Sequence, residues 1–212
     1  MQQNKSVKNI IDGRFYDIWN LPKGMVINGD LDLSGLGLTE LPDLSTIEVN
    51  GRFICSDNLL SDLRNGPKYA RVYICSENPE LTSLTGAPEN VDVFNCSKCP
   101  KLQSFVGGPE RARLYMALHN DGLQDLTGVP ESVDTLIVNW CQNLKNLHGA
   151  PKKARIIDVS YNPALENLDE APKACERVIC DWDNDIADAV NKIDVARKYY
   201  RLGTTKPNNK AL

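Results

Sequence analysis

The sequence lacks several features that mark whole classes of protein. Only two of its 212 residues are histidine, which argues against a metal or catalytic site built from several histidines. No apolar run approaches the roughly 18 residues that cross a bilayer. The first fifteen residues show no apolar core of the kind that forms a secretory signal. We therefore expect a cytoplasmic protein with no membrane contact.

An excess of charge of one sign is also missing. The chain carries 24 Lys and Arg against 28 Asp and Glu, a formal net charge of −4 at pH 7. Domains that bind nucleic acid carry an excess of Lys and Arg, so this charge balance argues against a nucleic-acid partner. With 42% apolar and 25% charged residues, the composition predicts a folded rather than a disordered chain.

What the sequence does contain is a repeat. Similar segments recur around prolines spaced 21 residues apart, among them LTSLTGAPEN, LQSFVGGPER, LQDLTGVPES and LKNLHGAPKK. These prolines are Pro67, Pro88, Pro109, Pro130, Pro151 and Pro172. With two earlier units of slightly different length and one later unit, about eight units of 20–22 residues cover residues 27–190. One such unit cannot bury its own apolar face, so the repeat predicts a stacked, β-rich solenoid with one parallel sheet.

The pattern resembles the leucine-rich repeat, L-x-x-L-x-L-x-x-N/C-x-L, with Ala70, Tyr73, Cys75, Asn78 and Leu81 at the matching places and one added residue before the last. Its proline-containing half resembles short repeats of bacterial secreted effectors and of uncharacterised tailed-phage proteins. The resemblance implies a horseshoe or arc with a concave sheet. It also implies a phage or bacterial protein that captures or inhibits a host protein, in the host-cell cytoplasm if phage-encoded.

The repeat divides the chain into four parts. We expect an N-terminal cap with a short helix over 1–26, the solenoid over 27–183, a C-terminal capping helix over 184–203 and a flexible tail over 204–212. The two caps are needed because the ends of a solenoid otherwise expose its core.

Strand alternation assigns side chains to the inside of the solenoid. The first inward row holds Leu31, Phe53, Tyr73, Phe94, Tyr115, Leu136, Ile157 and Val178. All seven cysteines fall in repeat positions: Cys55, Cys75, Cys96 and Cys180 in the second inward row, Cys99 and Cys141 where other units carry Asn, and Cys175 at the start of the last unit. Their odd number and their placement favour small buried core residues, although stacked neighbours leave a disulfide or soft-metal site geometrically conceivable. We predict no metal and no cofactor.

The outward positions carry the candidate binding surface. Apolar side chains recur along the sheet at Val72, Ile74, Val93, Leu114, Met116, Ile137 and Ile156. The strand ends add four rings, His119, Trp140, Tyr161 and Trp182. An exposed patch of this size indicates a protein-binding face, unless the N-terminal segment covers it. Just before the strands, a row alternates in charge (Arg71, Asp92, Arg113, Asp134, Arg155, Glu176), which predicts a structural ladder in which each Arg lies between two carboxylates.

No set of residues in the sequence suggests catalysis. His119 and His148 lack a nucleophile and an orienting acid in matching positions, and no phosphate-binding glycine loop is present. The favoured function is therefore non-enzymatic protein–protein interaction, with a host protein or with the chain itself, so that oligomers are an open outcome. Two alternatives remain: a structural component, such as part of a virion or an oligomeric scaffold, and a nucleotide or nucleic-acid binder that uses the rings.

Overall fold

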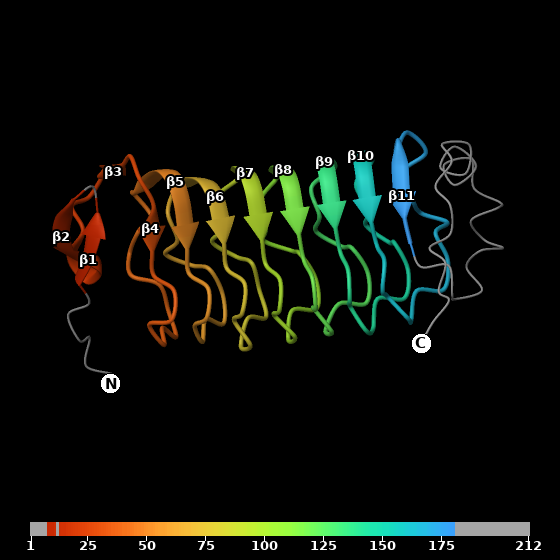
Figure 1. The fold of residues 1–212 in the computed structure, drawn as a ribbon, viewed down its shortest axis with the longest axis horizontal. Helices are drawn as coiled ribbons and strands as arrows, with labels where there is room; N and C mark the ends of the chain where they lie inside the picture. Colours follow the sequence, from red (N-terminus) through yellow and green to blue (C-terminus); the bar gives the residue numbers. More distant parts are fainter. Residues whose placement is uncertain (1–7, 12, 181–212) are drawn as a thin grey trace, which may run out of the picture.

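A computed structural model describes residues 8–11 and 13–180 of the chain. They form a β-solenoid of about seven turns, each of about 21 residues, with one parallel sheet along one side (Figure 1). The predicted repeat and single parallel sheet are confirmed. About seven turns take the place of the eight expected units, and the last of those units continues past residue 180.

The sheet runs in the order β11-β10-β9-β8-β7-β6-β5-β3, with β4 paired to β5 beside β3. Its strands are β3 (Val26–Ile27), β4 (Leu31–Asp32), β5 (Glu48–Ile54), β6 (Tyr69–Ile74), β7 (Asn90–Asn95), β8 (Arg111–Met116), β9 (Ser132–Ile137), β10 (Lys153–Asp158) and β11 (Arg177–Ile179). Consecutive strands are neighbours and keep the 21-residue register, so that Phe94 lies beside Tyr115 and Tyr115 beside Leu136. Equivalent residues of successive units therefore form straight rows along the solenoid.

The N-terminal cap is built differently from our expectation. In place of a helix, β1 (Lys8–Ile11) and β2 (Arg14–Asp17) pair antiparallel, followed by the single 3-10 turn η1 (Ile18–Asn20). The Asp12-Gly13 pair is a hairpin signature, and Gly13 has the positive φ of 77° that such a turn requires. Ile11 and Ile18 are buried against the solenoid core, so the hairpin does cap its end. The expected C-terminal helix and tail lie outside the described residues.

The interior is filled by the predicted inward rows. Phe53, Tyr73, Phe94 and Tyr115 are fully buried and contact one another along the first row, with ring centroids 4.9, 5.6 and 5.1 Å apart. Leucines of the return segments, such as Leu81 and Leu84, close the core from the other side. A single turn cannot bury its own apolar side chains. Each buried ring or leucine therefore packs against the neighbouring turn and stabilises the contact between the two turns.

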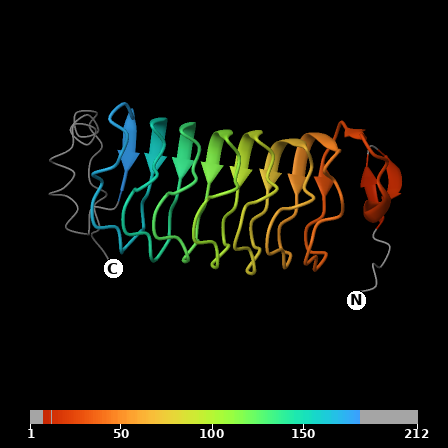
Figure 2. The same cartoon turned by 180° about the vertical axis from the view of Figure 1, so that it is seen from behind.

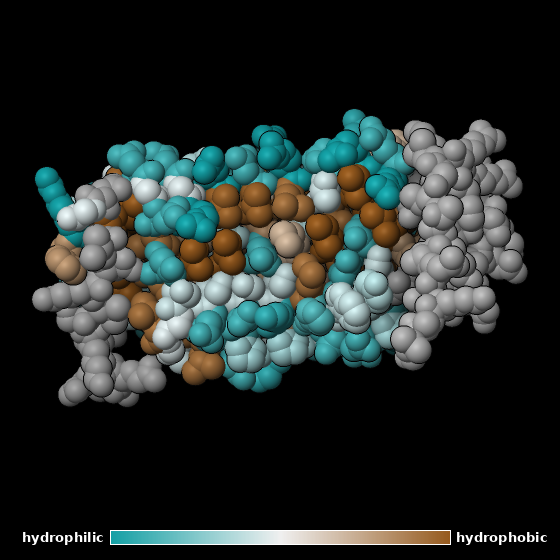
Figure 3. Space-filling view, in the orientation of Figure 1, coloured by the Kyte–Doolittle hydropathy of each residue, from teal (hydrophilic) through white to brown (hydrophobic). Residues whose placement is uncertain are grey.

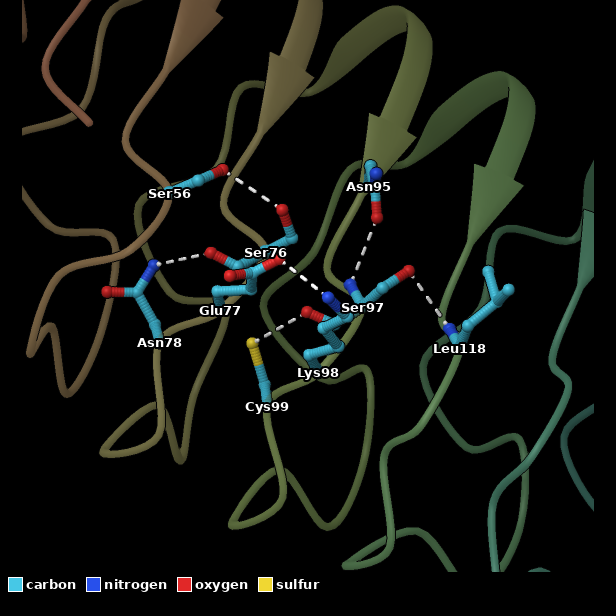
Figure 4. A network of polar contacts seen from close by, with 9 residues as sticks. All are labelled: Ser56, Ser76, Glu77, Asn78, Asn95, Ser97, Lys98, Cys99 and Leu118. Atoms are coloured by element: carbon cyan, nitrogen blue, oxygen red, sulfur yellow. Dashed lines mark hydrogen bonds and ion pairs between the residues drawn. The ribbon is translucent and has the colours of Figure 1, made fainter. Parts of the chain in front are cut away.

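Buried asparagines connect the turns through the backbone. Asn78 donates from Nδ2 to the carbonyls of Cys55 and Cys75, at 3.0 Å each, and accepts at Oδ1 from the Leu60 amide at 3.1 Å. Figure 4 shows Asn78 at the corner that follows β6, beside Ser76. Asn120 makes equivalent bonds two turns further on, and Asn162 makes them four turns further on. Each asparagine thus satisfies backbone groups of two units at a buried corner, as predicted.

All seven cysteines are buried members of the core, which confirms the prediction that they occupy core positions. Where Cys99 and Cys141 replace the corner asparagine, their thiols donate weakly to backbone carbonyls, Cys99 to that of Cys75 at 3.6 Å and Cys141 to that of Ala117 at 3.4 Å. Burial raises the pKa of Cys99 to about 11 and that of Cys141 to about 12. Burial also raises the pKa values of Cys55, Cys75 and Cys96.

The return segments turn sharply just before each proline. Gly86 has a φ of 101°, and a side chain there would collide with the carbonyl of Leu63 in the preceding turn. Gly107, Gly128 and Gly149 repeat both features. The glycine is therefore required twice, by its backbone conformation and by the close approach of the neighbouring turn.

Replacing Asn78 by alanine should destabilise the protein by about 3 kcal/mol, because three buried backbone groups lose their partner. The measurement is the midpoint of urea unfolding, monitored by circular dichroism. The two proteins should show the same dependence of the unfolding free energy on urea concentration. Asn143→Ala is the control, since this exposed amide makes only one bond, to the Asp121 carbonyl. Equal effects of the two substitutions would contradict the bridging role of Asn78.

Stability should fall as the pH rises above about 8.5, the ordinary pKa of a cysteine in the unfolded chain. Above that pH the unfolded state releases thiol protons that the folded state keeps, at up to about 1.4 kcal/mol per thiol and pH unit. The stabilisation is fully present below pH 8.5 and is lost as the pH rises toward the raised folded values of about 11 for Cys99 and about 12 for Cys141. Urea midpoints between pH 7 and pH 10 in reducing buffer test this. Cys99→Asn should flatten the slope, and a midpoint independent of pH would show that the thiols are not buried as described.

Candidate functional site

The outer face of the sheet carries a continuous strip of apolar side chains. Two rows alternate with the buried core rows along each strand, and sheet register aligns them: Val72 with Val93, and Met116 with Ile137. We call the following seven half-buried residues the apolar strip: Val72, Ile74, Val93, Leu114, Met116, Ile137 and Ile156. Figure 3 shows this apolar band over the strands, with hydrophilic side chains above and below it. The structure therefore brings these seven predicted residues together on one surface.

Polar residues interrupt the apolar strip at few positions. Thr135 lies in its first row, and Asn95 and Asp158 lie in its second. At the β4 end the first row closes with Arg52, whose guanidinium donates to Asp30 at 2.7 and 2.9 Å. The strip is thus bounded by charge at that end, and seven of the ten positions in its two rows over β6 to β10 are apolar.

The described N-terminal residues do not cover the apolar strip. The β1–β2 hairpin lies at the β3 end of the solenoid in both views (Figures 1 and 2), where Ile11 and Ile18 pack into the core. Phe15, on the same hairpin, is 74% exposed. Covering by residues 8–11 and 13–23 is therefore excluded as the reason for the apolar face.

A row of small polar side chains separates the strip from the strand ends. Ser56 and Ser76 join their hydroxyls at 3.0 Å, and the Ser97 hydroxyl accepts from the Leu118 amide at 3.0 Å (Figure 4). These hydroxyls are engaged within the sheet, so this border of the strip is polar after β5, β6 and β7, and Leu118 takes the same position after β8.

The next position, which we call the corner row, has an unusual backbone. Asp57, Glu77, Lys98, His119, Trp140 and Tyr161 all have φ between 54° and 62°, and Gly35 occupies the same place in the first unit with a φ of 66°. Left-handed backbone is unfavourable for a side chain with a Cβ, and more so for bulky residues. We did not predict this strain. The sequence signal for it is Gly35, because glycine is common at positive φ and Gly35 aligns with Asp57 of the next unit.

Three rings of the corner row stack on one another. The His119 and Trp140 centroids are 5.7 Å apart with planes at 17°, and those of Trp140 and Tyr161 are 4.0 Å apart with planes at 7°. Trp140 is 40% exposed and Tyr161 is 49% exposed. The ring faces therefore contact each other, and the ring edges meet solvent. Trp182, the fourth predicted ring, lies outside the described residues.

The row of alternating charge on the other side of the strip forms only part of the expected ladder. Arg155 donates to both carboxylate oxygens of Asp134, at 2.8 and 3.0 Å, and these bonds hold the pKa of Asp134 below its usual range. Within residues 8–180, Arg71, Asp92 and Arg113 make no ion pair and are exposed. Over these residues the predicted ladder therefore forms an ion pair between Asp134 and Arg155 but none at Arg71, Asp92 or Arg113. An exposed pair gains little over two hydrated charges and loses side-chain entropy.

Other candidate sites resolve into structural features. His148 contacts Glu170 through Nδ1 at 3.0 Å on the exposed return side, far in sequence from His119 in the ring stack. A groove of about 780 Å³ lies between the proline corners before β8 and β9, lined by Glu110, Arg111 and Glu131 among others, and a similar groove recurs at the earlier corners. Over the described part of the chain, no group of three potential metal ligands occurs. In the same residues, no helix is long and apolar enough to cross a membrane.

The left-handed backbone at Trp140 predicts that a glycine variant is more stable there than an alanine variant, the reverse of the usual order. Trp140→Gly should be more stable than Trp140→Ala by about 0.5–1 kcal/mol, because alanine keeps the cost of left-handed backbone and glycine does not. At Gln124, an exposed return-side residue without positive φ, alanine should be the more stable of the two. Chemical denaturation of the four variants gives the comparison. An alanine variant at residue 140 as stable as the glycine variant would contradict the strain.

No family model, curated protein or solved structure matches this chain.

Proposed function

We propose that this protein is a non-enzymatic binding module that contacts another protein through the apolar strip. The observation that carries the proposal is the grouping of seven half-buried apolar side chains in two aligned rows over β6 to β10. A contiguous apolar surface rimmed by polar residues is typical of a protein interface. The serine and charged borders provide that rim.

The resemblance to leucine-rich repeats supports the same surface, because the sheet side of such an arc is its concave side. On that resemblance, we propose that the protein is phage-encoded or bacterial and that it captures or inhibits a protein in the cytoplasm of a host cell. The ring stack at His119, Trp140 and Tyr161 lies along one border of the strip and would supply aromatic contacts at the rim of the interface.

Two alternative functions fit the surface less closely. A nucleotide binder would need an open ring face, but Trp140 and Tyr161 are already stacked at 4.0 Å, too close to admit a base between them. A structural component would use the same strip for assembly, and it differs from the favoured function only in the identity of the partner. The experiment must therefore report which protein touches the strip.

The triple variant Ile74→Asp, Met116→Asp, Ile137→Asp should reduce partner binding at least about 100-fold, because it places three charges in the centre of the apolar strip. The matched control is Gln103→Asp, Gln124→Asp, Lys145→Asp, which adds charge to exposed return-side positions of nearby units. Far-ultraviolet circular dichroism establishes that both variants fold.

A photo-reactive amino acid at Met116 identifies the contact, with the same group at Gln124 as the reference. A cross-linked adduct seen from Met116 and absent from Gln124 is expected. Its mass distinguishes a foreign protein from a second copy of this chain. Binding that survives the triple variant would overturn the assignment to this face.

A further inference from the structure

The charges beside the apolar strip form a self-complementary pattern. The charged row reads Arg71, Asp92, Arg113, Asp134, Arg155 and Glu176, with one residue on each strand from β6 to β10 and Glu176 directly before β11. Six charges that alternate in sign become their own complement when the order is reversed. A two-fold axis produces this reversal when a sheet faces a second copy of itself. Arg71, Asp92 and Arg113, half of the row, form no ion pair within the described chain.

On this basis we infer that the apolar strip binds a second copy of this chain, sheet against sheet, about a two-fold axis that runs parallel to the strands between β8 and β9. The inference rests on the proposed binding face, and it assigns a second copy of this chain, in place of a host protein, as the partner of that face. In this arrangement Arg113 faces Asp134 of the other copy, and Asp92 faces its Arg155.

The polar interruptions of the strip select the same axis. Reversal about this axis places Met116 over Ile137, and Asn95 over Asp158 of the other copy. Asn95 uses Oδ1 to accept from the Ser97 amide at 3.0 Å, which leaves its Nδ2 to donate. Asp158 uses Oδ1 to accept from Ser160 at 2.5 and 3.1 Å, and its Oδ2 accepts no hydrogen bond from the described residues. From β6 to β11, the one amide of this row therefore meets its one carboxylate, donor against acceptor.

Neighbouring axes fail on one pattern or the other. An axis through β8 would place Arg113 over itself and Asp92 over Asp134, like charge on like charge. An axis between β7 and β8 keeps opposite charges together, but places Asn95 over Met116 and leaves its amide without a polar partner. Only the axis between β8 and β9 satisfies the charged row and the second row of the strip together.

The size of the face indicates a weak dimer. Five strands of six residues and the three-residue β11, spaced by about 4.8 Å with about 3.3 Å per residue, give a face of about 500 Å² on each copy. Two such faces remove about 1,000 Å² from water, at the lower limit for specific interfaces. The dimer should therefore form in the micromolar range and respond to salt, because charge pairs line one border.

Charge reversal at one contact tests the inference. Arg113→Asp and Asp134→Arg should each weaken dimerisation by at least about 100-fold, because each places like charges opposite one another twice in the symmetric dimer. An equimolar mixture of the two variants should form a heterodimer, since residue 113 of the first (Asp) then faces residue 134 of the second (Arg), and Asp134 of the first faces Arg113 of the second. Lys145→Asp, on the return side, is the control and should dimerise as the unmodified chain does.

Sedimentation equilibrium between about 1 and 200 µM, a range that spans weak specific contacts, gives the masses. Mass that rises with concentration for the unmodified chain, monomers for each variant and a heterodimer in the mixture are expected. A monomer at every concentration overturns the second copy as partner, while a foreign adduct from Met116 would leave the binding face in place. A dimer that neither the charge variants nor the triple aspartate variant weakens overturns both. Two monomeric variants that fail to combine overturn the axis and the inference with it.

Discussion

Each turn of the solenoid takes its backbone hydrogen bonds from the turns beside it. On the sheet side the amide of Cys75 donates to the carbonyl of Asn95 at 2.8 Å, and on the return side that of Phe105 donates to Thr127 at 2.8 Å. Because both sides of a turn form backbone hydrogen bonds with the next turn, an insertion in one unit would break its hydrogen bonds to the two neighbouring turns. This constraint accounts for the unvarying 21-residue spacing of the prolines from Pro67 to Pro172.

The same constraint turns sequence positions into rows of side chains. A residue on one strand lies beside its equivalents on the next, so buried positions carry aliphatic, aromatic and thiol side chains, and the corner asparagines whose amides bond to the backbone. Outward positions are not restricted in this way. They carry an apolar strip, an alternating charged row and a stack of rings, each running along the solenoid. The fold thus supplies a regular frame, and the chemistry of the surface comes from the residues placed on it.

Strain is concentrated at one border of this surface. In six successive units, from Asp57 to Tyr161, the corner-row residue has left-handed backbone although it is not glycine. Gly35 shows that glycine fits at this position. In three of the six, the ring stack gives a reason for the larger side chain. Glu77 and Lys98 form an ion pair at 2.8 Å across the same row. Stacking and pairing between turns offset part of the backbone cost at these corners.

Much of the solenoid could be predicted because its signals are local and repeated. The inward rows, the buried corner asparagines, the core placement of the cysteines and the grouping of the seven strip residues follow from the period and from strand alternation. The N-terminal cap could not be predicted in the same way, since it occurs once and no repetition in the sequence distinguishes its hairpin from a short helix.

By itself, the sequence determined the period, the single parallel sheet, the interior and the identity of the outward residues, because a repeat states the same information many times. Tertiary structure decided which charges pair, where the hairpin lies and that the corner residues are left-handed. These outcomes depend on distances between turns and on competition with water, which a pattern of residue types does not contain. The apolar strip belongs to both: its residues are visible in the sequence, and its exposure is a property of the fold.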